Sequence, residues 1–164
     1  MASLPDISVV VTSYNSRQAL SQGLDALARM GERRHSLEVI VVDDASWDGS
    51  PQMVAEKYSW VHLIANEQNL GYARSCNRGI AAARGRFIHL LNNDTQLQPE
   101  TLDTLADFLE THPKAGVAGS LLLDEDGATQ VSAKALPSVR SALFGGRSWI
   151  SRWGFPPTTP ITPS

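Results

Sequence analysis

The chain alternates between short apolar runs and longer segments whose apolar residues recur every three or four positions. Four runs are apolar at consecutive positions, and they lie at 7–13 (ISVVVTS), 37–44 (LEVIVVDD), 61–65 (VHLIA) and 87–92 (FIHLLN). Consecutive apolar positions are typical of parallel strands covered on both faces, because a strand with one face in water alternates apolar and polar residues. We therefore predict four buried strands.

The segments between and after these runs predict helices. One lies within 16–31, a second opens at Ser50, a third spans about 71–84 and a fourth lies within 98–113. In the second helix Ser50 can act as the N-cap, with Pro51 at the first helical position. Strands that alternate with helices predict right-handed βαβ units and a mostly parallel α/β sheet.

The pattern changes after residue 115. Residues 116–132 (GVAGSLLLDEDGATQVS) predict two strands joined by a turn at Asp126-Gly127. Asp126 is the last acidic residue, and the following segment 137–155 mixes arginines with aromatic residues. Residues 156–164 are rich in proline, so we expect a disordered tail there.

Composition narrows the class of protein. The chain has 164 residues, 42% of them hydrophobic and 19% charged, which indicates a globular domain. A net charge of −3 argues against a nucleic-acid partner. The single cysteine, Cys76, cannot form an internal disulfide, which fits a reducing compartment. We see no signal peptide, and no apolar run approaches the roughly 20 residues that span a bilayer. We therefore expect a cytoplasmic protein, soluble or peripheral at the inner face of the membrane.

Polar residues cluster where three of the predicted strands end. The clusters are Thr12-Ser13-Tyr14-Asn15, Asp43-Asp44-Ala45-Ser46 and Asn92-Asn93-Asp94. Each cluster alone is equally well explained by helix caps and turns. Ligands of open α/β sheets bind outside the carboxyl ends of the strands, so three clusters at one edge favour a shared site.

The residue types suggest what such a site would hold. The glycine-rich phosphate motifs of P-loop and dinucleotide-binding proteins are absent. Carboxylate and amide oxygens suit Mg²⁺, which takes one or two carboxylates together with substrate phosphates, and Asp94 is the best-placed ligand. Arg74 and Arg78 share one face of the third helix, as phosphate contacts or as a solvated surface.

Other reactive residues have simpler explanations. We expect His89 to be a half-buried strand residue and Cys76 a small buried side chain. No Ser/His/Asp or Cys/His constellation is legible, so nucleophilic hydrolase chemistry has no support.

Three segments in order resemble the family 2 glycosyltransferases of the GT-A fold, closest to the rhamnosyltransferase-like branch. They are SVVVTSYNS (8–16), EVIVVDDASWDGS (38–50) and NEQNLGYARSCNRGIAAARGRFIHLLNNDTQLQPETL (66–102). The resemblance runs from about residue 7 to 140. It implies a Rossmann-like three-layer α/β/α sandwich with a mostly parallel central sheet, with residues 1–136 as the nucleotide-sugar-binding domain.

The resemblance also implies site residues. Contacts to the nucleotide sugar are implied for Thr12, Tyr14, Asn15, Asp43, Asp44, Asn69, Gly71, Arg74, Asn77, Asn92 and Asn93. Within this set, Thr12, Tyr14 and Asp44 would contact base and ribose. Asn92-Asn93-Asp94 takes the place of the family's D-x-D motif, so Asp94 would hold Mg²⁺ or Mn²⁺. The metal would neutralise a departing diphosphate, and an Asp or Glu base would deprotonate the acceptor in a single inverting displacement.

No candidate base is evident, because no acidic residue follows Asp126. We therefore expect residues 137–155 to begin an incomplete acceptor half. One hypothesis is a metal-dependent inverting glycosyltransferase that acts on a glycan, lipid-linked or cell-surface polysaccharide acceptor. The other is a nucleotide-sugar-binding module without transferase activity of its own.

Two questions of association stay open. The basic and aromatic segment 137–155 could lie on an anionic membrane, although we favour packing against the missing half. A homo-oligomer is also left open.

Overall fold

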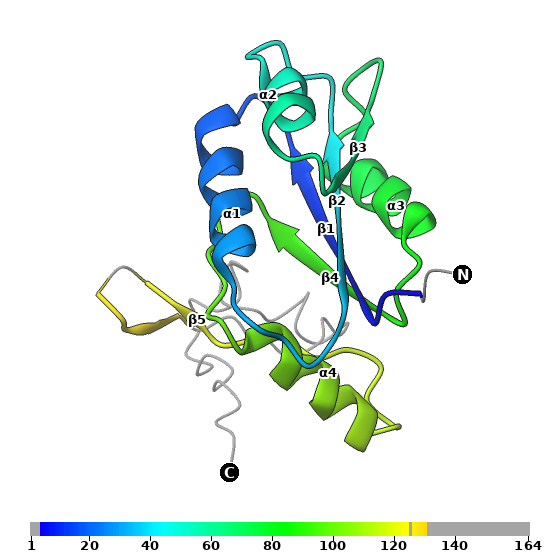
Figure 1. Cartoon of the computed structure of the whole chain (residues 1–164), viewed down its shortest axis with the longest axis vertical. Coiled ribbons are helices and arrows are strands. Elements are labelled where there is room, and N and C mark those ends of the chain that lie inside the picture. The colour runs from blue at the N-terminus through cyan, green and yellow to red at the C-terminus, as the bar shows by residue number, and fades with distance from the viewer. Residues whose placement is uncertain (1–3, 125, 131–164) are drawn as a thin grey trace, which may run out of the picture. The chain divides into compact units, whose positions relative to one another are not determined.

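The computed structural model describes residues 4–124 and 126–130 (Figure 1). The chain divides into two compact units, residues 1–118 and 119–164, which are considered separately. The predicted boundaries at 136/137 and 155/156 lie outside the described residues, as does the basic and aromatic segment.

The first unit is built on a four-stranded parallel sheet, as predicted. Its strands are β1 (Ile7–Ser13), β2 (Leu37–Asp43), β3 (Val61–Ala65) and β4 (Phe87–Asn92), in the order β3-β2-β1-β4 (Figure 1). In the register of the sheet Ser13 pairs with Asp43, and Thr12 pairs with both Val42 and Asn92. The three polar clusters therefore leave the sheet at one common edge.

Helices cover both faces of this sheet. One face is packed by α1 (Arg17–Arg29), α2 (Ser50–Lys57) and α4 (Thr101–Thr111), and the other by α3 (Tyr72–Ala82) (Figure 1). The covering is most complete over β1 and β2, which are buried at consecutive positions as expected. Strand β3 is only partly buried, and Ile88 and Leu90 of β4 are exposed, so the expectation of four buried strands holds for the two central strands only.

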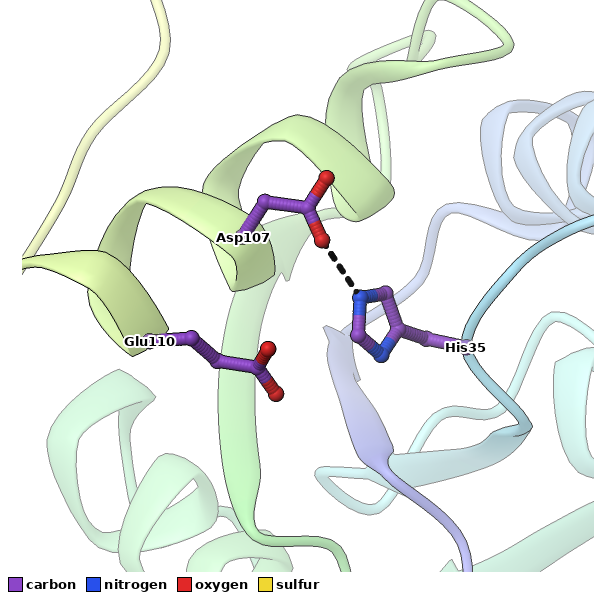
Figure 2. Close-up of side chains that lie close together, drawn as sticks. All are labelled: His35, Asp107 and Glu110. Carbon is purple, nitrogen blue, oxygen red and sulfur yellow. Dashed lines mark hydrogen bonds and ion pairs between the residues drawn. The ribbon is translucent and has the colours of Figure 1, made fainter.

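At the amino ends of the strands, α4 is held by charged groups. The buried carboxylate of Asp103 accepts hydrogen bonds from the backbone N–H groups of Arg34 and His35, at 3.0 and 3.3 Å. One turn further on, Asp107 faces the His35 ring with 2.9 Å between Oδ1 and Nε2 (Figure 2). The segment before β2 is therefore tied to α4 through side chains.

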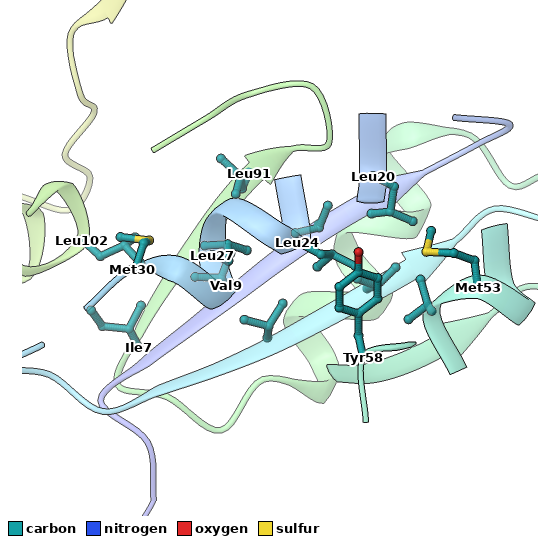
Figure 3. Packing of buried hydrophobic residues seen from close by; sticks show 14 of the residues in the cluster. Ile7, Val9, Leu20, Leu24, Leu27, Met30, Met53, Tyr58, Leu91 and Leu102 are labelled. Carbon is teal, nitrogen blue, oxygen red and sulfur yellow. The ribbon is translucent and has the colours of Figure 1, made fainter. Parts of the chain in front are cut away.

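The larger core lies under α1, α2 and α4. Leu20, Leu24 and Leu27 of α1 pack against Val9, Val11, Val39 and Val41 of the sheet, with Met53, Tyr58 and Leu102 around them (Figure 3). On the other face, Val10, Ile40 and Val42 form a smaller cluster with Ile64, Ala82 and Ala83. His89 is half-buried and Cys76 is buried, as expected, and burial lowers the pKa of His89.

Two glycines allow helices to approach the sheet and its loops closely. A Cβ at Gly79 of α3 would overlap the side chain of Val10. A Cβ at Gly23 of α1 would lie 3.1 Å from the backbone oxygen of Asn93. Larger residues would push α3 away from the sheet, or α1 away from the loop after β4.

The expected role of Ser50 as an N-cap is wrong. Helix α2 has Gly49, in the left-handed conformation, as its N-cap, and Ser50 is the first helical residue. The Asp48 carboxylate accepts the N–H and the hydroxyl of Ser50, at 3.0 and 2.6 Å, and also the N–H of Arg17, at 2.8 Å. A carboxylate therefore serves the N-termini of both α1 and α2, where the helix dipoles favour negative charge.

In the second unit the described residues form the predicted hairpin. Strands β5 (Leu122–Leu123) and β6 (Thr129–Gln130) pair antiparallel, and Gly127 in the turn has a φ of +78°. Over the described parts of the chain, no helix has both the length and the apolar character needed to cross a bilayer.

Candidate functional site

The carboxyl edge of the sheet opens into a cleft of about 470 Å³. The residues around it come from the ends of β1 and β4, from the loops after β1, β2, β3 and β4, and from the start of α3. They are Thr12, Ser13, Tyr14, Ser16, Asp44, Asn69, Gly71, Tyr72, Ser75, Asn92, Asn93 and Asp94. The structure therefore brings together eight of the twelve residues that the sequence analysis proposed.

The remaining four lie outside the cleft lining. Asp43 is only 1% exposed, and its Oδ2 accepts the N–H of Ser46 at 2.8 Å. Asn15 accepts the N–H of Trp47 through Oδ1 at 3.0 Å. Arg74 and Asn77 are exposed on α3. Asp43 and Asn15 thus shape the loops beside the cleft.

Asp44 is the most firmly held acidic group of the cleft. Its Oδ1 accepts the N–H of Leu70 at 2.8 Å and the side-chain amide of Asn66 at 2.7 Å, and its Oδ2 accepts the N–H of Gly71 at 2.8 Å. Burial by itself raises the pKa of Asp44, but these hydrogen bonds, with a contribution from Ser75, lower the pKa more and hold it below its ordinary value. Asp44 therefore stays ionised and organises residues 66–71.

Asn66 extends this network into α3. Its side-chain amide also donates to Ser75 Oγ at 3.0 Å, and its Oδ1 accepts a hydrogen bond from Arg78. Arg78 is thereby engaged in supporting the loop. For Arg74 the structure records no ion pair within residues 4–124, so its guanidinium is available to a ligand.

The loop after β4 has a different character. Asn93 donates to Ser16 Oγ, the hydroxyls of Ser16 and Ser13 lie 3.1 Å apart, and Tyr72 donates to Asn92 Oδ1 at 3.4 Å. Asp94 is exposed, and within residues 4–124 no hydrogen bond or ion pair to its carboxylate is recorded. The two amides are engaged by the protein, whereas the carboxylate is free for a metal or ligand.

A second group of potential metal ligands lies elsewhere, at the amino edge. The ligand atoms of His35, Asp107 and Glu110 fall within 4.8 Å of one another (Figure 2). However, Asp107 forms an ion pair with Arg34 at 2.6 Å, and Glu110 forms one with Arg86. The hydrogen bond from His35, and then the nearby charge of Arg34, lower the pKa of Asp107. Each carboxylate already has a cationic partner, so this cluster is an ionic contact that attaches α4.

Three cleft residues, Ser16, Tyr72 and Ser75, were not proposed from the sequence, and Ser13 was named only as a member of the first polar cluster. Ser75 is buried on α3, four residues after Gly71 and four before Gly79, so helical spacing of small residues could have indicated its inward position. Ser16 had no such signal, since its place depends on the contact between α1 and the loop after β4.

The sequence of the chain is similar to those of known glycosyltransferases. The family model described as "Glycosyl transferase family 2" matches residues 8–152. The N-acetylglucosaminyl-diphospho-decaprenol L-rhamnosyltransferase of Mycobacterium tuberculosis is 31% identical over 144 residues, covering 81% of this chain and 46% of the relative. The succinoglycan biosynthesis protein ExoO of Rhizobium meliloti is 41% identical over 101 residues, covering 60% of this chain and 28% of the relative. The chain thus spans less than half the length of these relatives.

Solved structures show the same fold. Residues 1–349 of Staphylococcus aureus TarS in complex with UDP-GlcNAc match with a TM-score of 0.60 and 32% identity, over 66% of this chain and 32% of that one. The mannosyltransferase PcManGT of Pyrobaculum calidifontis, in complex with GDP-Man and Mn²⁺, matches with a TM-score of 0.59 and 28% identity, over 66% and 33%. The parallel sheet with helices on both faces is the GT-A fold, and the chain belongs to the family 2 glycosyltransferases.

Proposed function

We propose that this chain binds a nucleoside-diphosphate sugar in the cleft and serves a metal-dependent, inverting sugar transfer. The acceptor would be a glycan, a lipid-linked saccharide or a cell-surface polysaccharide, as in polysaccharide or cell-wall biosynthesis. The observation that carries the proposal is the convergence of three strand-end clusters on one cleft that contains a free carboxylate, Asp94.

The lining of the cleft supports contacts of different residues with different parts of the donor. Thr12, Tyr14 and Asp44 would meet the base and ribose, while Asn69 and Gly71 would line the sugar-nucleotide pocket. Arg74 and Asn77 lie on the adjoining helix, where Arg74 could approach the diphosphate. Asn15 and Asp43 would act indirectly, through the loops that they hold. The complexes of TarS with UDP-GlcNAc and of PcManGT with GDP-Man support this class of donor.

The residues after β4 fit a divalent cation. Mg²⁺ and Mn²⁺ favour oxygen ligands, and Mg²⁺ commonly takes one or two carboxylates together with substrate phosphates. Asp94 offers its carboxylate, and the amide oxygens of Asn92 and Asn93 lie in the same lining. When bound, the ion would neutralise the negative charge that develops on the leaving diphosphate. The Mn²⁺ in the PcManGT complex supports the choice of ion.

One observation favours a second candidate function. Among the described residues, the acidic groups that line the cleft are Asp44 and Asp94. Asp44 is already hydrogen-bonded to the 66–71 loop, and Asp94 is assigned to the metal, so neither is free to act as the base. On this view the chain is a nucleotide-sugar-binding module that needs further polypeptide for transfer.

Isothermal titration calorimetry tests donor binding directly. UDP, dTDP and GDP are titrated with and without Mn²⁺ into the chain, into Asp94→Ala and into Glu56→Ala, a control on the exposed face of α2. We expect Asp94→Ala to lose the Mn²⁺-dependent part of the affinity, about tenfold or more, and Glu56→Ala to match the wild type. If none of the nucleotides binds, the donor proposal is wrong. If the affinity is the same with and without Mn²⁺ and in Asp94→Ala, the metal assignment is wrong.

An acceptor assay separates the two functions. A glycosylated acceptor product made by the 164-residue chain alone would reject the module hypothesis. Slow release of free sugar would not distinguish the two, because water can replace the acceptor.

A further inference from the structure

Two aromatic side chains stand on neighbouring loops beside the cleft. Tyr14 follows β1 and lines the cleft, whereas Trp47 follows β2 and is 77% exposed. Their rings meet edge to face, with 5.5 Å between the centroids and an interplanar angle of 85°. Since so little of Trp47 is buried, its contribution to the core cannot explain its position.

The two loops that carry these rings are fastened to each other. The N–H of Asn15 donates to Ser46 Oγ at 2.9 Å, and the N–H of Trp47 donates to Asn15 Oδ1 at 3.0 Å. Each loop also passes through the left-handed region at a residue other than glycine, with φ of +47° at Asn15 and +64° at Ala45. Such conformations persist where surrounding contacts hold them, so the backbone beneath both rings is constrained.

We propose that Trp47 is a positioning residue for the donor nucleotide: it fixes the ring of Tyr14 so that Tyr14 stacks on the nucleobase. The inference rests on the proposed function. An edge-to-face pair occupies at most one face of the Tyr14 ring, which leaves a face for a flat ligand. Stacking between a base and an aromatic ring stabilises binding and tolerates different bases.

We assign the base, and not the diphosphate, to this aromatic pair because the candidate diphosphate contacts lie on other elements. Asp94, the candidate metal ligand, lies on the loop after β4, and Arg74 lies on α3. The aromatic pair lies on the loops after β1 and β2. Replacing Trp47 should therefore affect ligands that contain a base and spare ligands that consist of phosphate alone.

The chain contains a matched control for this test. Trp60 forms the same kind of edge-to-face pair with Tyr58, with centroids 6.1 Å apart and an interplanar angle of 89°. Trp60 is 45% exposed, and it lies just before β3, at the opposite end of the strand from the cleft. Trp60→Ala therefore removes a comparable aromatic pair without touching the cleft.

The experiment measures affinities by calorimetry for the wild type, Trp47→Ala, Trp47→Phe and Trp60→Ala. The ligands are UDP, dTDP and GDP with Mn²⁺, the free nucleosides, and pyrophosphate with Mn²⁺. We expect Trp47→Ala to weaken nucleotide and nucleoside binding by about three- to tenfold and to leave pyrophosphate within about twofold. Trp47→Phe should recover most of the loss, because a ring remains to contact Tyr14, and Trp60→Ala should bind as the wild type does.

A double-mutant cycle then identifies the route of the effect. When Tyr14 is already replaced by alanine, adding Trp47→Ala should lower nucleotide affinity by less than about twofold, because the ring that Trp47 positions is gone. An equal cost in both backgrounds, an equal loss for pyrophosphate, or no loss in the wild-type background would overturn the inference while nucleotide binding itself stands. Failure of the wild-type chain to bind any of the three nucleotides would overturn the proposed function, and this inference with it.

Discussion

The two edges of the parallel sheet are both rich in charged and polar residues, yet they use them differently. At the amino edge, Glu38 accepts hydrogen bonds from Ser8 and from three nitrogen atoms of Arg84. Asp103 accepts two backbone N–H groups there, and Asp107 and Glu110 have arginine partners. Each of these four carboxylates therefore has a hydrogen-bond or ion-pair partner within the protein.

At the carboxyl edge only one of the two carboxylates that line the cleft has hydrogen-bond partners in the protein. Asp44 is held by the 66–71 loop, as Asp103 is held by the segment before β2. Asp94, in contrast, has no recorded partner within residues 4–124, and it faces a cleft lined by amides and hydroxyls. Asp94 is therefore distinguished from the acidic residues of the amino edge by two features together: it lines the cleft, and its carboxylate has no recorded protein partner among residues 4–124.

Substitution of Asp44 should have the largest effect. Asp44→Ala leaves the N–H groups of Leu70 and Gly71 and the amide of Asn66 without an acceptor, so we expect a loss of about 2–4 kcal/mol in the free energy of unfolding. Nucleotide affinity should fall as well, because the 66–71 loop lines the cleft. Urea denaturation and calorimetry measure the two effects. Retained affinity would show that this loop does not need Asp44 to form the site.

Asp103 is the counterpart at the amino edge. It is 7% exposed and accepts two backbone N–H groups, so Asp103→Ala should lower the free energy of unfolding by about 2–3 kcal/mol. Nucleotide affinity, measured at a temperature where the variant is folded, should stay within about twofold of the wild type. A large loss of affinity in the folded variant would break the distinction between the two edges.

The decrease in the free energy of unfolding at acidic pH should depend in part on Glu38. Burial raises the pKa of Glu38, but hydrogen bonds from Ser8 and Arg84 lower it more, and it lies below the ordinary value of 4.5. Since the folded state binds the proton less tightly than the unfolded state, this stabilisation is complete above the unfolded pKa. It is lost as pH falls through the folded pKa. Unfolding followed between about pH 6 and pH 3 should show a flatter acid limb in Glu38→Gln. An unchanged slope would contradict the assignment.

The smallest effect is expected at Glu110. Its ion pair with Arg86 joins two solvent-accessible side chains, and such pairs contribute about 0–1 kcal/mol. Glu110→Gln should therefore change the melting temperature by only a few degrees, and Mn²⁺ binding should be unaffected. A loss of Mn²⁺ binding in Glu110→Gln, with Asp94→Ala unaffected, would move the metal site to the cluster in Figure 2.

Much of the architecture was determined by the sequence itself. Four apolar runs predicted the four strands, and the helical segments between and after them predicted α1 to α4, because both kinds of element leave a direct pattern in residue order. The pattern did not predict that β3 and β4, unlike β1 and β2, are only partly buried. The polar clusters at 12–15, 43–46 and 92–94 could be assigned to one edge, since parallel strands all end on the same side. The candidate metal ligand Asp94 also followed from this reasoning and stays a prediction.

Only the tertiary structure showed which polar residues make contacts that hold the fold together. Asp44 binds a loop 26 residues away, Asp103 binds a segment 69 residues away, and Tyr14 meets Trp47 across two loops. Adjacent Asp43 and Asp44 look alike in the sequence and both are buried, but only Asp44 lines the cleft. Contacts of a side chain with a distant backbone group or ring depend on the register of the sheet and the approach of the helices, and they leave no periodic pattern along the chain.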